Sequence, residues 1–502
     1  MDLPGNLTLV LNSALLALGV SAISLPMGAV LGLLLTRTDL PGRKCFAALL
    51  ATFLFVPLYL QAAGWQAAFG VQGWSTAYFS QAAWLAGWRG AIWVHSMAAI
   101  PWVALIVGAG VWSVEPELEE DALLDASAGR VFAAVTLRRA LAAVGVAALW
   151  ILVSTAGEMT VTDFFQIRTY AEEIYINFNL GPEPADVALA ALPGALFIGC
   201  LVLAALVGCA RLAPNQRQAS TRPPVCFNLG HWRWPCVVSV SMLLLLVVAM
   251  PIVNLLFKAG EVTTASAAGL SRGWSPIKCL RFIANSPFRY DDEIAWSLLI
   301  ASLAATAAVV VAVQVAWFAC RGGWRATLSL LMTSVLLALP GPVIGVAIMS
   351  LMNQPAVPLL TTLYDRSIAA PWCAMLLRSL PLATLVAWYA LRGVPRDTLD
   401  AAAADGAGPQ RRLWLVAVPQ RVAGLSAAWL VAFVIALGDL AASILVLPPG
   451  MTTISVRVFQ ELHSGQEDYV AGICLALSAS FGALTLTAAW LMNRTLAKEG
   501  RS

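Results

Sequence analysis

The stretch Leu118-Glu-Glu-Asp-Ala-Leu-Leu-Asp-Ala-Ser127 decides how this chain is organised, because a related stretch follows 281 residues later, Leu399-Asp-Ala-Ala-Ala-Ala-Asp-Gly-Ala-Gly408. Each copy lies in a charged loop between two long apolar segments. The same offset also aligns Gly157-Glu158 with Gly438-Asp439. A constant offset over such a length indicates an internal duplication.

Composition places the chain in the membrane. Of its 502 residues, 60% are hydrophobic and only 11% are charged, whereas about a quarter of a soluble domain is charged. Apolar runs of about 20 residues are long enough to cross a bilayer as helices, and runs of this length favour helices over barrel strands. We therefore expect an all-α polytopic membrane protein.

Hydropathy in windows of about 19 residues predicts eleven transmembrane helices. They lie near residues 9–36, 46–66, 89–113, 140–160, 187–210, 236–257, 294–320, 326–352, 367–391, 422–446 and 469–492. With the N-terminus outside, twenty of the thirty Lys and Arg residues fall in the inner segments and nine in the outer ones. This bias follows the positive-inside rule and places both repeated loops in the cytoplasm.

The duplication predicts two parallel five-helix units joined by one extra span. The first unit covers 1–210 and the second 294–502; the intervening 211–293 holds a linker, the extra span 236–257 and an outer loop. Each unit has an odd number of spans, so a second unit joined directly to the first would insert upside down. The extra span restores its orientation. An offset of 284 also aligns Asn12-Ser13 with Trp296-Ser297, and Arg37 with Arg321.

The two loops, at 114–139 and 393–421, resemble the cytoplasmic "EAA" coupling loop of ABC-importer permeases of the MetI-like type. That family pattern is Glu-Ala-Ala, three residues, Gly, and a hydrophobic-x-Leu-Pro ending. In the second copy Asp400 stands for the glutamate, Gly406 is present and Pro419 closes the motif. The first copy has Asp125 at the glycine position and Arg138 at the proline position, and its acidic run 119–121 can be aligned in two ways.

The resemblance implies a subunit without catalytic residues. It implies a bacterial inner-membrane, multi-pass permease that works with two copies of a separate ATPase and with an extracytoplasmic solute-binding protein. The chain has no Gly-x-x-x-x-Gly-Lys-Ser/Thr motif for holding phosphates, so ATP hydrolysis is expected on another chain. The implied ATPase-coupling residues are Glu119, Glu120, Asp125, Asp400, Asp405, Gly406 and Pro419. The alternative interpretation of each loop is a solvated amphipathic segment.

Two acids occupy matching positions at the ends of predicted spans, Glu158 and Asp439. Acidic groups at membrane depth are costly and usually face a cavity or a partner, so we expect these residues beside the pathway or at a receptor contact. The alternative is an interfacial carboxylate solvated by water and headgroups. Arg378 lies well inside a span and is expected either to pair with an acid from a neighbouring helix or to extend towards the interface.

Metal, cofactor and nucleic-acid chemistry is not expected. The nine cysteines include no Cys-x-x-Cys pair, and the three histidines are far apart in the sequence. Neither set has the spacing of a metal site.

The fused two-unit chain, with Gly438-Asp439-Leu440 followed by Leu447-Pro448-Pro449-Gly450, is similar to ferric-iron permeases. This resemblance implies ferric iron as the solute. Importers of thiamine, sulfate, polyamine and phosphonate share the architecture and stay open as alternatives. A different class, an ion-coupled secondary transporter with parallel repeats, would use the intramembrane acids as proton relays and would need no coupling loop.

Overall fold

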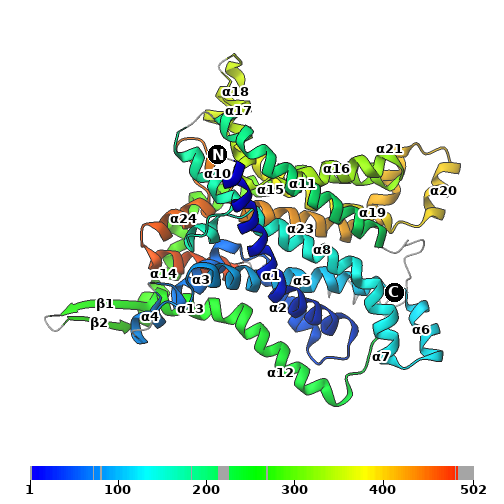
Figure 1. The fold of residues 1–502 in the computed structure, drawn as a ribbon, viewed down its shortest axis with the longest axis horizontal. Coiled ribbons are helices and arrows are strands. Elements are labelled where there is room, and N and C mark those ends of the chain that lie inside the picture. Colours follow the sequence, from blue (N-terminus) through cyan, green and yellow to red (C-terminus); the bar gives the residue numbers. More distant parts are fainter. Residues whose placement is uncertain are drawn as a thin grey trace.

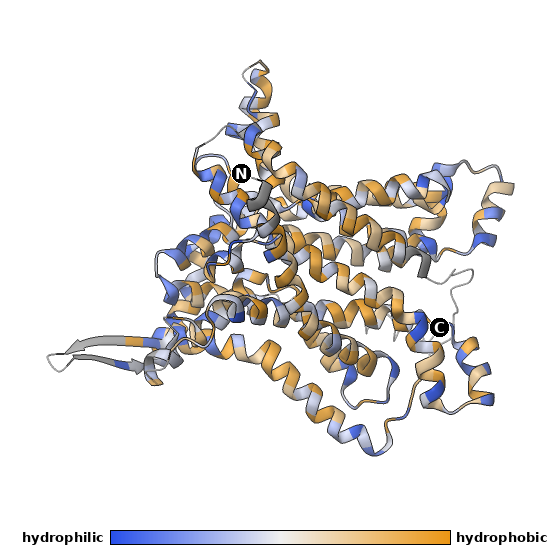
Figure 2. Cartoon of the chain, in the orientation of Figure 1, coloured by the Kyte–Doolittle hydropathy of each residue, from blue (hydrophilic) through white to orange (hydrophobic). Residues whose placement is uncertain are grey.

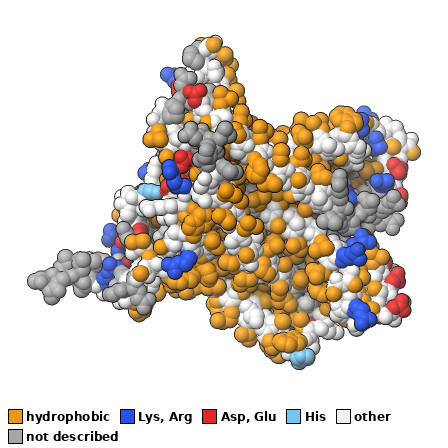
Figure 3. All heavy atoms as spheres, in the orientation of Figure 1, with side chains coloured by type: hydrophobic (Ala, Val, Ile, Leu, Met, Phe, Trp, Pro, Cys, Tyr) orange, Lys and Arg blue, Asp and Glu red, His pale blue; other side chains and the backbone are white. Residues whose placement is uncertain are grey.

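The structure is a computed structural model of the 502-residue chain. It describes all residues except 1–2, 72, 80–81, 182–183, 213–224, 267–268, 355, 481 and 484–502. Helices form most of the described chain, and the long ones are apolar along their middle sections (Figures 1 and 2). Charged side chains gather at the two ends of these helices, on either side of a broad apolar belt (Figure 3). The expected all-α polytopic membrane fold is confirmed.

Up to ten of the eleven predicted spans are found among the described residues. Among the described residues, seven helices are long and apolar enough to cross a membrane, and three bent helix pairs raise the number to ten. The eleventh predicted span, 469–492, is helical from 467 to 480, and most of its remainder lies outside the described residues.

The first unit contains five membrane elements. They are α1 (Leu3–Arg37), the bent pair α2 (Arg43–Leu54) with α3 (Leu58–Phe69), α5 (Gly87–Trp112), α8 (Leu137–Ala156) and α11 (Pro184–Leu212). In this unit α1, α5 and α8 pack against one another.

The second unit repeats this order. Its elements are α15 (Asp291–Cys320), the bent pair α16 (Trp324–Ala338) with α17 (Gly341–Met352), α19 (Ala369–Arg392), α23 (Val422–Gly438) and the helix 467–480. Here α15, α19 and α23 pack together as α1, α5 and α8 do.

Two predicted spans, 46–66 and 326–352, are broken helices and not continuous ones. Each is bent by 98°, and the bends are at Pro57 and Pro340. A proline has no N–H for the helix ladder, and it forces the preceding residue out of the helical conformation. The two prolines therefore place the same bend in both units.

Small residues bring the first and third membrane elements of each unit into close contact. A Cβ on Gly28 would lie 2.6 Å from Cβ of Val103, and one on Gly32 would lie 2.4 Å from the Ala104 carbonyl oxygen. Alanines 312 and 316 hold the matching places in the second unit and are fully buried. Such residues allow helix backbones to approach within a membrane.

A pair of hydrogen bonds shows that the repeats are structurally equivalent. The Ser13 hydroxyl accepts a bond from the Tyr170 amide at 3.0 Å, and the Ser297 hydroxyl accepts one from the Ile454 amide at 2.8 Å. Ser297 and Ile454 each lie 284 positions after their counterparts, Ser13 and Tyr170. They join the first span of each unit to the helix outside its fourth span, α10 (Tyr170–Asn179) or α24 (Ile454–His463). These contacts support the predicted parallel duplication.

The two units exchange their fifth spans. Helix α11 packs on α16 and α17, where Val202 and Ile198 join a buried cluster with Leu337 and Ile344. The helix 467–480 places Ile473 and Cys474 in the core that surrounds α2 and α3. Each fifth span thus covers the bent second span of the opposite unit.

The extra span runs from η2 (Gly230–Trp232) through α12 (Arg233–Leu244) and η3 (Leu245–Ala249) to α13 (Met250–Gly260). It packs on the first unit, and a Cβ on Gly64 of α3 would lie 2.8 Å from Cβ of Pro251. An antiparallel hairpin follows, β1 (Glu261–Ser266) and β2 (Gly269–Trp274), and projects from the molecule (Figure 1). Helix α14 (Pro276–Arg289) then leads into α15.

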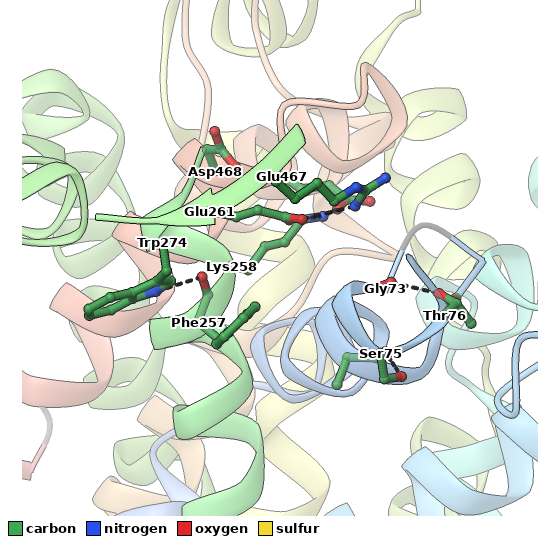
Figure 4. Close-up of polar contacts among 12 residues, drawn as sticks. Gly73, Ser75, Thr76, Phe257, Lys258, Glu261, Trp274, Glu467 and Asp468 are labelled. Carbon is green, nitrogen blue, oxygen red and sulfur yellow. Dashed lines mark hydrogen bonds and ion pairs between the residues drawn. The ribbon is translucent and has the colours of Figure 1, made fainter. Parts of the chain in front are cut away.

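A charged cluster fixes the base of this hairpin to the second unit (Figure 4). Nζ of Lys258 lies 3.1 Å from a carboxylate oxygen of Glu261 and 2.7 Å from one of Glu467. Lys278 pairs with Asp468 at 2.5 Å. Since Glu467 and Asp468 begin the last described helix, the extra span is held to both units.

Candidate translocation cavity and coupling helices

A cavity of about 170 Å³ lies between the two units. Matching elements line its two sides: the α2–α3 turn and α16, then α5 and α19, then α8 and α23. The cavity therefore lies on the pseudo-twofold axis that relates the repeats. Its polar and aromatic lining includes Gln61, His95, Trp102, Trp150, Glu158, Arg378 and Asp439.

Glu158 and Asp439, the two acids singled out in the sequence, both line this cavity, and each caps a short helix beyond its span. The carboxylate of Glu158 accepts hydrogen bonds from the amides of Thr160 at 2.6 Å and Val161 at 3.0 Å, at the start of α9 (Thr160–Phe164). Asp439 accepts one from the Ser443 amide at 3.0 Å, at η5 (Ser443–Leu445). Helix N-termini favour carboxylates because their first amides have no partner within the helix.

Basic groups accompany both acids. Nε of Arg378 lies 3.4 Å from Asp439, so this arginine pairs with an acid from a neighbouring helix. A Cβ on Gly157 would lie 3.2 Å from Nη1 of Arg378, which shows that the guanidinium reaches the first unit as well. His95 lies 3.8 Å from Glu158. Each of the two acids therefore has a basic side chain within 4 Å, Arg378 for Asp439 and His95 for Glu158.

Sequence reasoning missed His95 and the tryptophan pair. Trp102 and Trp150 are in contact at the cavity wall, with ring centroids 4.9 Å apart. The sequence could have indicated His95 as a pathway residue, because it lies within the predicted span 89–113 and the other two histidines lie outside the predicted spans. No pattern in the sequence distinguishes these two tryptophans from the other seventeen.

The units also touch each other beyond the acids, on the face opposite the coupling loops. Met159 of the first unit joins Leu440, Ala441 and Phe459 of the second in a buried cluster. Beside it, Nε2 of His463 on α24 lies 2.8 Å from the carboxylate of Asp163 on α9. This contact closes the cavity on that face with one apolar cluster and one ion pair between units.

The two coupling loops lie at one end of the molecule, and each begins with a short helix (Figure 1). These helices are α6 (Pro116–Asp125) and α20 (Arg396–Ala404). After each comes a second helix with a π-helical segment at matching positions, η1 (Phe132–Thr136) after α7 (Ala128–Val131) and η4 (Arg412–Ala417) after α21 (Pro409–Arg411).

The two departures of the first loop from the family pattern have structural counterparts. Gly406 has φ of +79°, a left-handed conformation that favours glycine. In the first loop α6 ends at Asp125 and the chain continues in extended conformation at Ala126, so no left-handed residue is needed. Pro419, in α22 (Val418–Gln420), precedes an 87° bend into α23. Arg138 at the matching position lies within an unbroken helix from 128 to 156.

The predicted coupling residues differ in their exposure. Glu120, Asp125, Asp400, Asp405, Gly406 and Pro419 are exposed at the surface of the two loops. Glu119 is completely buried and pairs with Arg37 within the chain, at 2.6 Å. The two loops therefore present different sets of acidic groups at the surface.

Two parallel helical units around a shared cavity, with matching helix pairs at one end, define a polytopic membrane transport protein. Residues 308–495, within the second unit, match the family described as the binding-protein-dependent transport system inner membrane component. With the fold, this match supports an ABC-importer permease that is a multi-pass inner-membrane protein. The matched region includes the second of the two repeated loops, 393–421.

Two curated relatives are permeases for a polyamine. They are the putrescine transport system permease protein PotI of Escherichia coli strain K12 and that of Escherichia coli O6:H1 strain CFT073. Each is 26% identical over 212 residues, which cover 40% of this chain and 73% of the relative. Neither comparison bears out the predicted similarity to ferric-iron permeases.

We predict that Gly406→Arg leaves the permease folded in the membrane but abolishes substrate-stimulated ATP hydrolysis by the assembled transporter. The left-handed conformation costs a non-glycine residue about 1–2 kcal/mol, which is a local cost. A long cationic side chain also obstructs approach by another protein. Gly406→Asn, which tolerates this conformation, should retain most of the stimulation, and Asp125→Arg should be milder than Gly406→Arg. Full stimulation in Gly406→Arg at equal membrane abundance would contradict the coupling role of α20.

We also predict a pH-dependent contribution from His463 to the contact between the units. The hydrogen bond to Asp163 raises the pKa of His463 above its ordinary value of 6.5. The ion pair therefore stabilises the contact fully below that value, and its contribution is lost as the pH rises through the raised pKa. His463→Gln should lower the thermal unfolding temperature at pH 6 and have little effect at pH 9. Because the imidazole is 45% exposed, the effect should not exceed about 1 kcal/mol. A difference from wild type that does not vary with pH would contradict the pairing.

Proposed function

We propose that this permease imports a small organic cation of the polyamine class through the cavity between its two units. The observation that carries the proposal is the convergence of Glu158 and Asp439 with Trp102 and Trp150 around one cavity. Carboxylates bind ammonium groups with charge-assisted hydrogen bonds, and tryptophan faces attract cations through their π-electrons.

The mixed lining fits an organic ammonium ion better than a bare metal ion. Asp439 is already paired with Arg378, and Glu158 accepts two backbone hydrogen bonds. Within the described residues, no group of three or more His, Cys, Asp or Glu side chains could hold a metal ion. Hard metal cations require several oxygen ligands, which supports a polyamine over the ferric ion that the sequence analysis favoured.

The energy source in this proposal is a separate ATPase, in two copies, one at each coupling loop. The position of α6 and α20 at the same end of the molecule supports this arrangement (Figure 1). An extracytoplasmic solute-binding protein would deliver the polyamine to the opposite face, where α9, α10 and α24 lie. The family description, which makes transport dependent on a binding protein, supports such a partner.

A direct test replaces the two acids by their amides. Glu158→Gln with Asp439→Asn keeps oxygen acceptors for the caps of α9 and η5 while removing both negative charges. A hydrogen bond to a charged group contributes about 1.5–3 kcal/mol, so uptake of radiolabelled putrescine at low concentration should fall by roughly tenfold or more. Assembly with the ATPase should be unchanged.

Uptake of iron, thiamine and sulfate by the wild-type transporter is the control for substrate class. Accumulation of ferric iron and not putrescine would contradict the polyamine assignment and restore the iron hypothesis. Uptake that requires an ion gradient and no ATP would favour a secondary transporter.

A further inference from the structure

The first coupling helix is joined to the first span by a buried ion pair. Nη2 of Arg37, the last residue of α1, lies 2.6 Å from Oε1 of Glu119 on α6, and both side chains are fully buried. The hydroxyl of Thr136, in η1, donates a hydrogen bond to the same carboxylate oxygen. Three elements of the first unit therefore meet at one carboxylate.

A segment of the linker between the units covers this site. The Phe227 amide donates to the carbonyl oxygen of Arg37 at 2.8 Å, and Thr38 and Phe227 form a parallel β-bridge. Nη1 of Arg37 donates to the Val225 carbonyl oxygen at 3.3 Å. The Leu229 amide donates to the carboxylate of Asp39 at 2.9 Å.

The same segment touches the second helix of the coupling loop. The ring of Phe227 packs edge-to-face on Phe132 of η1, with centroids 5.5 Å apart. Residues 225–229 thus contact both the end of α1 and the helix that follows α6. This segment comes from the region that joins the two units.

The second unit has the equivalent residues but not the arrangement. Arg321 and Asp400 correspond to Arg37 and Glu119, and both are exposed. No hydrogen bond or ion pair joins these two side chains. The two pairs carry the same charges at similar separations, 82 residues for Arg37 and Glu119 and 79 for Arg321 and Asp400. The second acid is one methylene shorter, and residues 225–229 cover only the first pair.

We propose that Arg37, Glu119 and residues 225–229 form a brace that holds the first coupling helix rigidly on α1, and that the second coupling helix has no such brace. The linker between the units then serves a second purpose, which is to position one of the two surfaces that the ATPase contacts. Glu119 is a positioning residue in this arrangement, because its buried carboxylate offers no atom to a partner. The role at the ATPase rests on the proposed function, whereas the rigidity of α6 does not.

Hydrogen exchange of the full-length permease in lipid nanodiscs tests the brace without the ATPase. Removing one partner of a buried ion pair leaves an uncompensated charge, and helices with fewer tertiary contacts open more often. Arg37→Met and Phe227→Ala should each speed amide exchange in α6 by roughly tenfold or more, with α20 unchanged. The matched variant Arg321→Met should leave both helices at wild-type rates.

A double variant tests whether the unpaired buried charge, and not a general folding defect, causes the faster exchange in α6. Arg37→Met combined with Glu119→Leu removes both charges at once, and apolar replacement of a buried pair is often neutral or stabilising. Exchange in α6 should therefore return towards the wild-type rate. Phe227→Ala, which leaves the ion pair itself intact, guards against the case in which Arg37→Met fails to fold.

The brace would be overturned by wild-type exchange of α6 in both Arg37→Met and Phe227→Ala. It would equally be overturned if Arg321→Met sped exchange in α20 as much as Arg37→Met does in α6. Substrate-stimulated ATP hydrolysis, measured on the same variants, should fall in Phe227→Ala and stay at the wild-type level in Arg321→Met. A wild-type permease that stimulates no ATPase would contradict the proposed function, and the exchange result would still decide the brace.

Discussion

Exchange of the fifth spans between the two units is the packing on which the rest of the structure depends. Helix α11 covers α16 and α17, and the helix 467–480 lies in the core around α2 and α3. Apolar side chains gain little by leaving lipid for protein, so association within the membrane depends on close packing. Two bent helices with proline breaks offer concave surfaces that a straight neighbouring helix can fill. This mutual coverage holds the units together at their sides and leaves a cavity along the axis between them.

The acids at the ends of the fourth spans connect this packing to transport. Glu158 and Asp439 follow the ends of α8 and α23, cap the short helices beyond them, and border the cavity. A carboxylate at such depth is expensive unless amides or basic groups stabilise it, and both acids have such partners. In the proposed function, the carboxylate lone pairs that the caps leave free would bind a passing cation. The same residues therefore serve the fold and the proposed function.

The sequence offsets that predicted the repeat recur as matching contacts in the structure, and the coupling role of the two loops stays a prediction. The equivalence of Ser13 with Ser297, and the positive φ of Gly406, follow from offsets and residue types that are visible in the chain. The size of the bends at Pro57 and Pro340, 98° in each case, was not predicted because hydropathy measures apolar length and is insensitive to direction. The burial of Glu119 was missed for a different reason. Its partner Arg37 lies 82 residues away, and the exposed pair in the second unit has the same residue classes at nearly the same spacing.

The central claim is that solute crosses the membrane through the cavity between the units. The most direct measurement is ATP-driven putrescine uptake by the reconstituted transporter after treatment with a small thiol reagent, using a cysteine placed in the cavity wall as Ser154→Cys. None of the described cavity-lining residues is a cysteine, so the control is a background in which the exposed cysteines 45, 200, 226 and 320 are replaced by serine, and its uptake should survive the reagent. Treatment should block the Ser154→Cys variant, and putrescine present during the reaction should protect it. Unimpaired uptake in the fully modified variant would contradict a pathway through this cavity.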